Sequence, residues 1–185
     1  MREVATEELQ ALLDAQAGGT VRIDYDYRVC PDPGNKLILG WKHCLYLWTV
    51  TQPGLTIDGG GHRLEIVVDG TVQSDTALLA VPVNARGVHI KNWRITFVYN
   101  GEHTSRTVYA IRNQARNCKL TDLHVTMAAK RQINMTAVYN QGAIDTTLES
   151  GADELVVESC TFRMSNGAAT FELPQQYYGI YNHLA

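Results

Sequence analysis

The stretch Gly87-Val-His-Ile-Lys-Asn-Trp-Arg-Ile-Thr-Phe97 places apolar residues at alternate positions on either side of a polar Asn92. Its opening has counterparts at Gly54, Asn117 and Glu154, so that successive copies begin 33, 30 and 37 residues apart. Apolar alternation with a period of two is typical of β-strands, and recurrence at such intervals is typical of proteins built from stacked repeats. The sequence therefore predicts stacked β coils.

Alignment of the four copies predicts two sets of inward-facing residues, one on each side of a bend. The first set is Ile57, Ile90, Leu120 and Val157, and the second is Leu64, Ile95, Val125 and Phe162. The predicted bend positions are Gly59, Asn92, Asp122 and Ser159. Glycine, asparagine and aspartate accept left-handed backbone angles more readily than other residues, so we expect a structural role for these positions.

A second motif occurs as Tyr109-Ala-Ile-Arg-Asn113, Thr136-Ala-Val-Tyr-Asn140 and Tyr178-Gly-Ile-Tyr-Asn182. If its central aliphatic residues face inward, its asparagines face inward too and stack as a ladder of amides. The residues between them then face solvent on strands about 4.8 Å apart. One predicted exposed column is Arg112, Tyr139 and Tyr181, and the next is Gln114, Gln141 and His183.

The domain prediction is a single unit over residues 1–185. An amphipathic helix over 6–18, N-capped by Thr6, is expected to cover one end of the stack, and coils are expected from about 20 to 183. No second cap follows His183 in this sequence. An uncovered end exposes core residues and strand edges, so we expect either a longer chain or a partner chain, including a second copy, at that end.

The composition of the chain limits which partners and cofactors are expected. The chain has 185 residues and a formal net charge of −3, and its pI is near 6.0, so nucleic acid is not expected as a partner. It has no apolar run of 18 residues and no pattern of a secretory signal, so neither a membrane span nor a signal peptide is predicted, and the compartment stays open. The four cysteines lack zinc-site spacing, so no metal or other cofactor is predicted. Cys30 and Cys44 fit either a disulfide or free thiols.

Three features carry a resemblance to a known family: the opening 9–23, the segment Leu55-Thr-Ile-Asp-Gly-Gly-Gly-His62, and the recurring Gly-Ile-x-Asn and Val-x-Ile-x-Asn coils. Over about residues 6–183 the sequence resembles the pectate-lyase-like proteins, which include polysaccharide lyases, glycoside hydrolases, uronate epimerases and phage tailspikes. The resemblance implies an all-β fold, a right-handed parallel β-helix of about four to five coils. It also implies that a glycan lies across one parallel sheet, walled here by the connections 98–107, 128–136 and 165–177.

The leading functional hypothesis is recognition of a polysaccharide or glycan on the predicted exposed columns, with lyase chemistry favoured over hydrolysis if bonds are broken. The catalytic candidates are Arg112, Tyr139 and His183, and the substrate-binding candidates are Tyr181, Gln114 and Gln141. Arginine pairs with a uronate carboxylate, tyrosine rings cover sugar faces, and Tyr or His can move a proton. Simple stacking of side chains along a sheet is the structural alternative.

Hydrolysis requires two carboxylates, and the predicted exposed columns carry none. The loop candidates are Glu102, Asp145, Glu149 and Glu172. A rival face aligns Arg63, Arg94, His124 and Thr161 as a basic column for an anionic glycan or phosphate, or as a solvated face balanced by Glu65 and Glu158. A mixed column of Asp58, Lys91, Thr121 and Glu158 is explained by lateral ion pairing. The competing function is a non-catalytic scaffold of the tail-fibre or adhesin type, joined to a partner at the uncapped end.

Overall fold

The computed structural model describes residues 1–15, 19–31, 38–39, 44–141, 154–166 and 177–183. Strands make up most of this part of the chain, and the helix α1 (Thr6–Asp14) is its one helix. The strands form two sheets, in which every pairing between described strands is parallel except that of β4 with β5. The predicted all-β class is therefore confirmed.

The larger sheet, here sheet A, has nine strands within the described residues, and its main order is β1-β3-β7-β9-β11-β13. Its members are β1 (Arg2–Glu3), β2 (Thr20–Arg22), β3 (Tyr27–Val29), β6 (Thr56–Asp58), β7 (Arg63–Val68), β9 (His89–Tyr99), β11 (Lys119–Ala129), β13 (Val156–Glu158) and β14 (Thr161–Asn166). Sheet B has the order β15-β12-β10-β8-β5-β4. Its members are β4 (Ile38–Leu39), β5 (Cys44–Thr49), β8 (Asp75–Val81), β10 (Thr107–Asn113), β12 (Asn134–Gln141) and β15 (Tyr177–His183).

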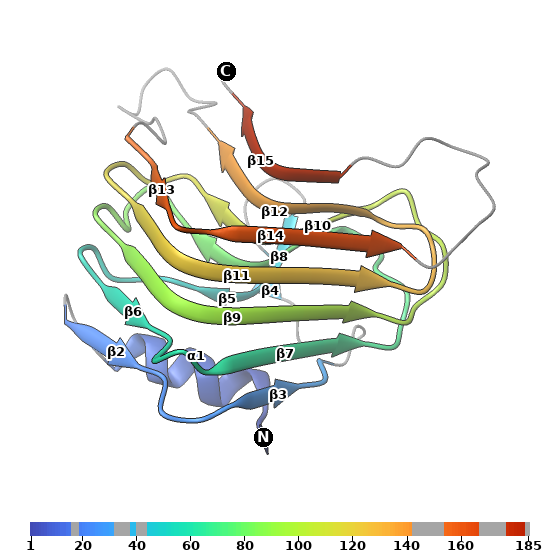
Figure 1. Cartoon of the computed structure of the whole chain (residues 1–185), viewed down its shortest axis with the longest axis horizontal. Helices are drawn as coiled ribbons and strands as arrows, with labels where there is room; N and C mark the ends of the chain where they lie inside the picture. Colours follow the sequence, from blue (N-terminus) through green and yellow to red (C-terminus); the bar gives the residue numbers. More distant parts are fainter. Residues whose placement is uncertain (16–18, 32–37, 40–43, 142–153, 167–176, 184–185) are drawn as a thin grey trace.

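The chain alternates between the two sheets. From β8 to β12 each strand of sheet B is followed by a strand or strand pair of sheet A, and each return to sheet B adds the new strand beside its predecessor. Figure 1 shows this as a colour gradient that runs across both sheets from the blue N-terminal strands to the red β15. Apolar residues from both sheets form one buried cluster between them. Residues about thirty positions apart in sequence therefore become neighbours on adjacent strands.

The predicted inward sets are confirmed. Ile57, Ile90 and Leu120 pair across β6, β9 and β11 and are at most 2% exposed, and Val157 continues the row on β13. The second row, on β7, β9, β11 and β14, consists of Leu64, Ile95, Val125 and Phe162. Burying an aliphatic side chain contributes about 1.5–3 kcal/mol to the free energy of folding, so these rows supply much of the free energy that stabilises the stacked strands.

Left-handed backbone recurs at the bend. Asn92, Asp122 and Ser159 have φ of 54°, 52° and 54°, which confirms three of the four predicted bend positions. In the first copy, Gly60 and Gly61 have the positive φ values, 58° and 75°. Gly59 lacks one. There a Cβ would lie 2.5 Å from Trp93, so this position needs glycine for close packing and not for left-handed backbone.

The opening residue of every repeat copy is left-handed as well: Gly54, Gly87, Asn117 and Glu154 have φ values of 68°, 71°, 57° and 63°. Two of the four are glycine and one is asparagine, the types that adopt this conformation most readily. These turns deliver the chain into sheet A at the same place in each copy, which explains why the openings recur in sequence.

The helix α1 is shorter than the expected 6–18, of which 16–18 lie outside the described residues. Its N-cap is Ala5 and not Thr6 as predicted; the carboxylate of Glu8 accepts the Ala5 amide at 3.4 Å, so Thr6 is free to enter the first turn. The helix packs against β5: Gln10 donates to Thr49 O at 3.0 Å and accepts from Thr49 N at 2.9 Å. The side chain thus occupies backbone groups that a neighbouring strand would otherwise take. This helix is not long and apolar enough to span a membrane, and it is the one helix in the described part.

At the opposite end of the stack, β15 is an edge strand of sheet B. Ile180 is 41% exposed, although its register partners Val138 and Ile111 are completely buried. A side chain in the inward row is buried by the strand added after it. Within the described residues no strand follows β15, so this inward position remains accessible.

Candidate functional site

The first candidate surface is the outer face of sheet B over β10, β12 and β15. Arg112 pairs with Tyr139 and Tyr139 with Tyr181, so the predicted column is in register. Asn113, Asn140 and Asn182 form the adjacent row, in which Asn113 donates to Asn140 at 2.8 Å and Asn140 donates to Asn182 at 3.2 Å. The predicted amide ladder is confirmed. It holds the three strands in a register that slips only by breaking these bonds.

Arg112 is fixed by neutral neighbours. Its Nη2 and Nε donate to Gln141 Oε1 at 2.6 and 3.2 Å, and Gln114 Nε2 donates to the same oxygen at 3.5 Å. The Arg112 guanidinium also lies 5.9 Å from the centroid of the Tyr139 ring, which is a cation–π arrangement. No described carboxylate forms an ion pair with Arg112. Its charge is therefore oriented but not neutralised by these residues.

Gln141 does not belong to an exposed column as expected. It pairs with His183 in register, but its residue is 4% exposed. Three hydrogen bonds, two from Arg112 and one from Gln114, converge on its side-chain oxygen and restrain the side chain beneath these residues. Its contribution is to position Arg112. The other two residues of this predicted column are more accessible, since Gln114 is half-buried and His183 is exposed.

Aromatic rings continue the surface beyond Arg112. The rings of Tyr139 and Tyr181 are stacked, with centroids 5.6 Å apart and planes 10° apart. The His183 ring lies 6.1 Å from Tyr139 and 6.3 Å from Tyr181. The catalytic candidates Arg112, Tyr139 and His183 are thus brought together, and Tyr181, which is 37% exposed, lies beside them.

Two further tyrosines, which neither predicted column contains, join this cluster. The Tyr109 ring lies 4.8 Å from Tyr139, and the Tyr178 ring lies 4.9 Å from Tyr181. In β10 the consecutive residues Ala110 and Ile111 are both completely buried, so strict alternation is interrupted between Tyr109 and Arg112. The signal in the sequence was the spacing of three in Tyr109/Arg112 and Tyr178/Tyr181, which a pure period of two overlooks.

The walls expected for a groove are shorter than predicted. The strands β9, β11 and β14 extend into the connections 98–107, 128–136 and 165–177, so the described loops before β10 and β12 cover 100–106 and 130–133. Glu102 is exposed, and its backbone oxygen accepts the Tyr99 hydroxyl at 2.7 Å. Asp145, Glu149 and Glu172 lie outside the described residues. An apolar cavity that includes Leu47, Phe97 and Val108 lies among core side chains between the sheets, so it is not a groove over Arg112.

The second candidate surface is the outer face of sheet A. Asp58, Lys91, Thr121 and Glu158 form one row, as predicted. Lys91 pairs with Asp58 at 3.5 Å, and Lys119 pairs with Glu158 at 2.9 Å. Lateral ion pairing therefore accounts for this row, and exposed pairs of this kind contribute at most about 1 kcal/mol each.

The predicted basic column is also in register. Arg63 pairs with Arg94, Arg94 with His124 and His124 with Thr161, and the first three residues are exposed. Glu65 and Glu158, expected to balance this column, form no ion pair with it. Glu65 lies 3.7 Å from Arg28, and Glu158 is taken by a lysine.

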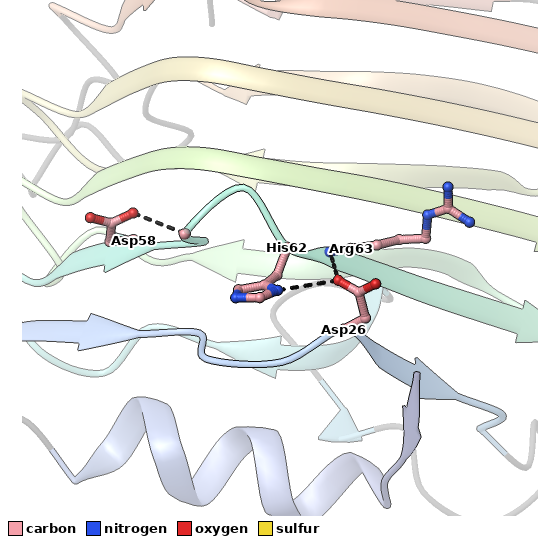
Figure 2. A network of polar contacts seen from close by, with 5 residues as sticks. Asp26, Asp58, His62 and Arg63 are labelled. Carbon is pink, nitrogen blue, oxygen red and sulfur yellow. Dashed lines mark hydrogen bonds and ion pairs between the residues drawn. The ribbon is translucent and has the colours of Figure 1, made fainter.

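The turn before β7 contains a small polar network (Figure 2). Asp26 Oδ1 accepts the backbone amide of Arg63 at 2.8 Å and lies 3.3 Å from His62 Nδ1. The backbone hydrogen bond from Arg63 is the main cause that lowers the pKa of Asp26, and His62 adds to it. In Figure 2 the Arg63 side chain extends away from this carboxylate, so Asp26 fixes the turn and does not neutralise the guanidinium.

The described residues hold no cluster of three or more His, Cys, Asp or Glu side chains that could hold a metal ion. Cys30 is exposed, Cys118 is buried and Cys160 is half-buried, and all three are free thiols. Burial raises the pKa of the Cys118 thiol, which keeps it protonated and unreactive. The side chain of Cys44 lies outside the described residues.

Two outer faces therefore carry polar side chains at regular positions. Sheet B has an oriented arginine among aromatic rings, and sheet A has a row of Arg63, Arg94 and His124 that forms no ion pair with the described residues. Comparison of the chain with protein-family models, with curated proteins and with solved structures finds no match.

Proposed function

We propose that the chain folds as a right-handed parallel β-helix of about four to five coils, of the kind its sequence resembles. Three observations support this. The chain alternates between two parallel sheets, inward rows stack in register, and the same left-handed turns recur in every copy. In such a stack the outer faces are rigid surfaces on which side chains repeat at the spacing of the strands.

On this scaffold we propose recognition of a glycan by the outer face of sheet B. The observation that carries the proposal is the state of Arg112, whose guanidinium is held by Gln141 at 2.6 Å, lies over Tyr139 and has no described carboxylate as a partner. An arginine that forms an ion pair with a carboxylate of the protein would have a structural role. Arg112 forms no such pair with the described residues, so its charge and its remaining N–H donors can bind an acidic group of a ligand. A uronate carboxylate matches it, since guanidinium binds carboxylates in a bidentate manner.

The aromatic rings define how a sugar is received. Tyr139 and Tyr181 stack on each other, so the face of Tyr139 toward Tyr181 is already covered. Tyr181 is 37% exposed and His183 is exposed, so the accessible ring surface lies at the β15 side. The proposed pose places the acidic group at Arg112 and a neighbouring sugar ring against Tyr181.

Bond cleavage would be β-elimination, since β10, β12 and β15 carry no Asp or Glu to act as a hydrolytic pair. In that reaction Arg112 neutralises the uronate carboxylate, Tyr139 or His183 removes the proton at the carbon beside it, and the electron pair expels the glycosidic oxygen. The centroids of the Tyr139 and His183 rings are 6.1 Å apart, so both approach one substrate position.

The test is a titration of oligogalacturonate and of its neutral counterpart into wild type, Arg112→Gln and Arg86→Gln, with absorbance of unsaturated uronate followed in parallel. Arg86 is an exposed arginine in the connection before β9 and serves as the matched control. The proposal expects binding of the acidic probe that weakens by about tenfold or more in Arg112→Gln alone. Equal affinity of Arg112→Gln and wild type would refute it. New reducing ends without unsaturated product would refute the lyase step.

A second candidate function is assembly, favoured by the exposure of Ile180. The edge of β15 fits one kind of occupant: a parallel strand of another chain, with an aliphatic residue beside Ile180 and an amide beside Asn182. Sedimentation velocity over a range of concentrations tests it. Association that disappears in Ile180→Asp supports assembly, and a monomer at every concentration contradicts it.

A further inference from the structure

We infer that the outer face of sheet A carries a second binding site, the cationic patch, for an anionic linear polysaccharide. The patch consists of Arg63, Arg94 and His124, with the hydroxyl groups of Thr96, Thr126 and Thr161 beside them. It lies on a different sheet from Arg112, so it does not depend on the glycan site proposed for sheet B.

The first support is the unfavourable placement of like charges. Arg63 and Arg94 are direct register partners on adjacent strands, which places two exposed guanidinium groups on rungs about 4.8 Å apart. His124 continues the same row on β11. Like charges directly opposite each other across a sheet destabilise it. No described residue supplies a counter-ion that would relieve this repulsion.

The second support is that no described carboxylate forms an ion pair with Arg63, Arg94 or His124. Asp26 accepts the backbone amide of Arg63 and lies beside His62 (Figure 2), and Glu65 faces Arg28 at 3.7 Å. Asp58 is taken by Lys91 at 3.5 Å. Asp122, at the bend before His124, forms no ion pair with the described residues. Lateral pairing explains the neighbouring row but leaves the cationic patch unexplained.

The shape of the patch selects the ligand class. Arg63, Arg94 and His124 form one row along the direction in which strands are added, on the paired strands β7, β9 and β11. A linear polymer with an anionic group on successive units matches such a row. The hydroxyls of Thr96 and Thr126 on one side of the row, and of Thr161 at its end, can bond sugar hydroxyls. A single-stranded polynucleotide fits less well, because such strands are usually held by stacking of their bases on aromatic side chains, and the patch contains no Tyr, Trp or Phe.

The experiment is a calorimetric titration with three oligosaccharides of equal length and with a single-stranded oligonucleotide. The oligosaccharides are oligogalacturonate, a heparin-type sulfated oligosaccharide and a neutral oligomer. It uses the full chain as wild type, Arg94→Gln, Arg63→Gln/Arg94→Gln and Arg106→Gln. Arg106 is an exposed arginine in the loop before β10 that forms no ion pair with the described residues, so its replacement makes the same change in net charge away from sheet A. Every variant is also titrated in the Arg112→Gln background, which removes the contribution of sheet B.

The expected result is binding of at least one anionic probe that persists in Arg112→Gln and weakens as salt is raised from 50 to 500 mM, since exposed charges are screened. Arg94→Gln is expected to weaken it by about tenfold, the double variant by more, and Arg106→Gln not at all. Preference for carboxylate or sulfate identifies the source of the anion. Failure of both anionic probes, an affinity unchanged in the double variant, or tighter binding of a single-stranded oligonucleotide would overturn the inference. Loss of all binding in Arg112→Gln alone would overturn the cationic patch and leave the sheet B site standing.

Discussion

Replacing the asparagines of the ladder one at a time by leucine is expected to destabilise the fold in a graded order. Asn113→Leu should have the largest effect, Asn140→Leu a smaller one and Asn182→Leu the smallest. The three positions share a motif and a register row, but Asn113 is 1% exposed, Asn140 is half-buried and Asn182 is exposed. The order therefore follows burial and not sequence.

The magnitude at Asn113 comes from its contacts. Its Nδ2 donates to Ala115 O at 3.0 Å and to Asn140 Oδ1 at 2.8 Å, and its Oδ1 accepts from Ala115 N at 3.3 Å. Ala115 is completely buried, so leucine at position 113 leaves two of its backbone groups without these partners. Each unsatisfied buried group costs about 1–3 kcal/mol, which predicts a loss of about 2–6 kcal/mol in the free energy of unfolding. That is a large share of the about 5–15 kcal/mol typical of a domain.

At Asn182 the expected loss is below about 1 kcal/mol, because its one ladder bond is exposed to water, which replaces it. Urea unfolding followed by circular dichroism measures each difference as a shift in midpoint. Asn84→Leu, at an exposed turn position, is the control for the change of residue type and should stay within about 0.5 kcal/mol of wild type. Equal losses at the three ladder positions, or the largest loss at Asn182, would refute a ladder whose strength depends on burial.

Three further outcomes are expected. Gly59→Ala should lower the free energy of unfolding by about 1–3 kcal/mol, since its Cβ would lie 2.5 Å from Trp93; an unchanged urea midpoint would contradict this packing. Arg94→Gln should raise stability by about 0.2–1 kcal/mol in low salt and by less in 0.5 M salt, where repulsion is screened; a loss of stability at both salt concentrations would show that the arginine is structural. The pKa of His89 is lowered from 6.5, first by burial and then by two neighbouring lysines, so the unfolded chain takes up the proton first as pH falls. The free energy of unfolding should therefore decrease below about pH 6.5, and this decrease should be smaller in His89→Gln. Urea titrations at pH 7.5 and 5.5 measure the decrease in both proteins. An identical pH dependence in the variant would contradict the role of His89.

Much of the fold was predictable because its information is local. Ile57, Ile90 and Leu120 recur at nearly constant spacing, and a strand period of two assigns them to the interior once the repeat is aligned. The amide ladder followed from the same step, since an asparagine two residues after an inward aliphatic residue shares its direction. The N-terminal helix was predicted in place but not in length or cap.

The candidate sites were less predictable, because they depend on where the chain departs from its period. Neither predicted column contains Tyr109, yet two consecutive buried residues follow it and its ring joins the outer aromatic cluster. Gln141 was assigned to an exposed column, yet its side chain is buried beneath the donors of Arg112 and Gln114. Neither result is encoded by spacing alone.

By itself the sequence determined the repeat, its all-β class, the inward rows and the register of neighbouring strands, because hydrophobic burial acts on every copy in the same way. The tertiary structure alone decided which charges remain unpaired. Glu65 lies two positions from Arg63 in the sequence, but its carboxylate lies beside Arg28 on β3. Asp26 is distant in the sequence and accepts the backbone amide of Arg63, not its guanidinium. Side-chain pairing is settled by distances across the sheet, and those exist only once strands from distant parts of the chain lie side by side.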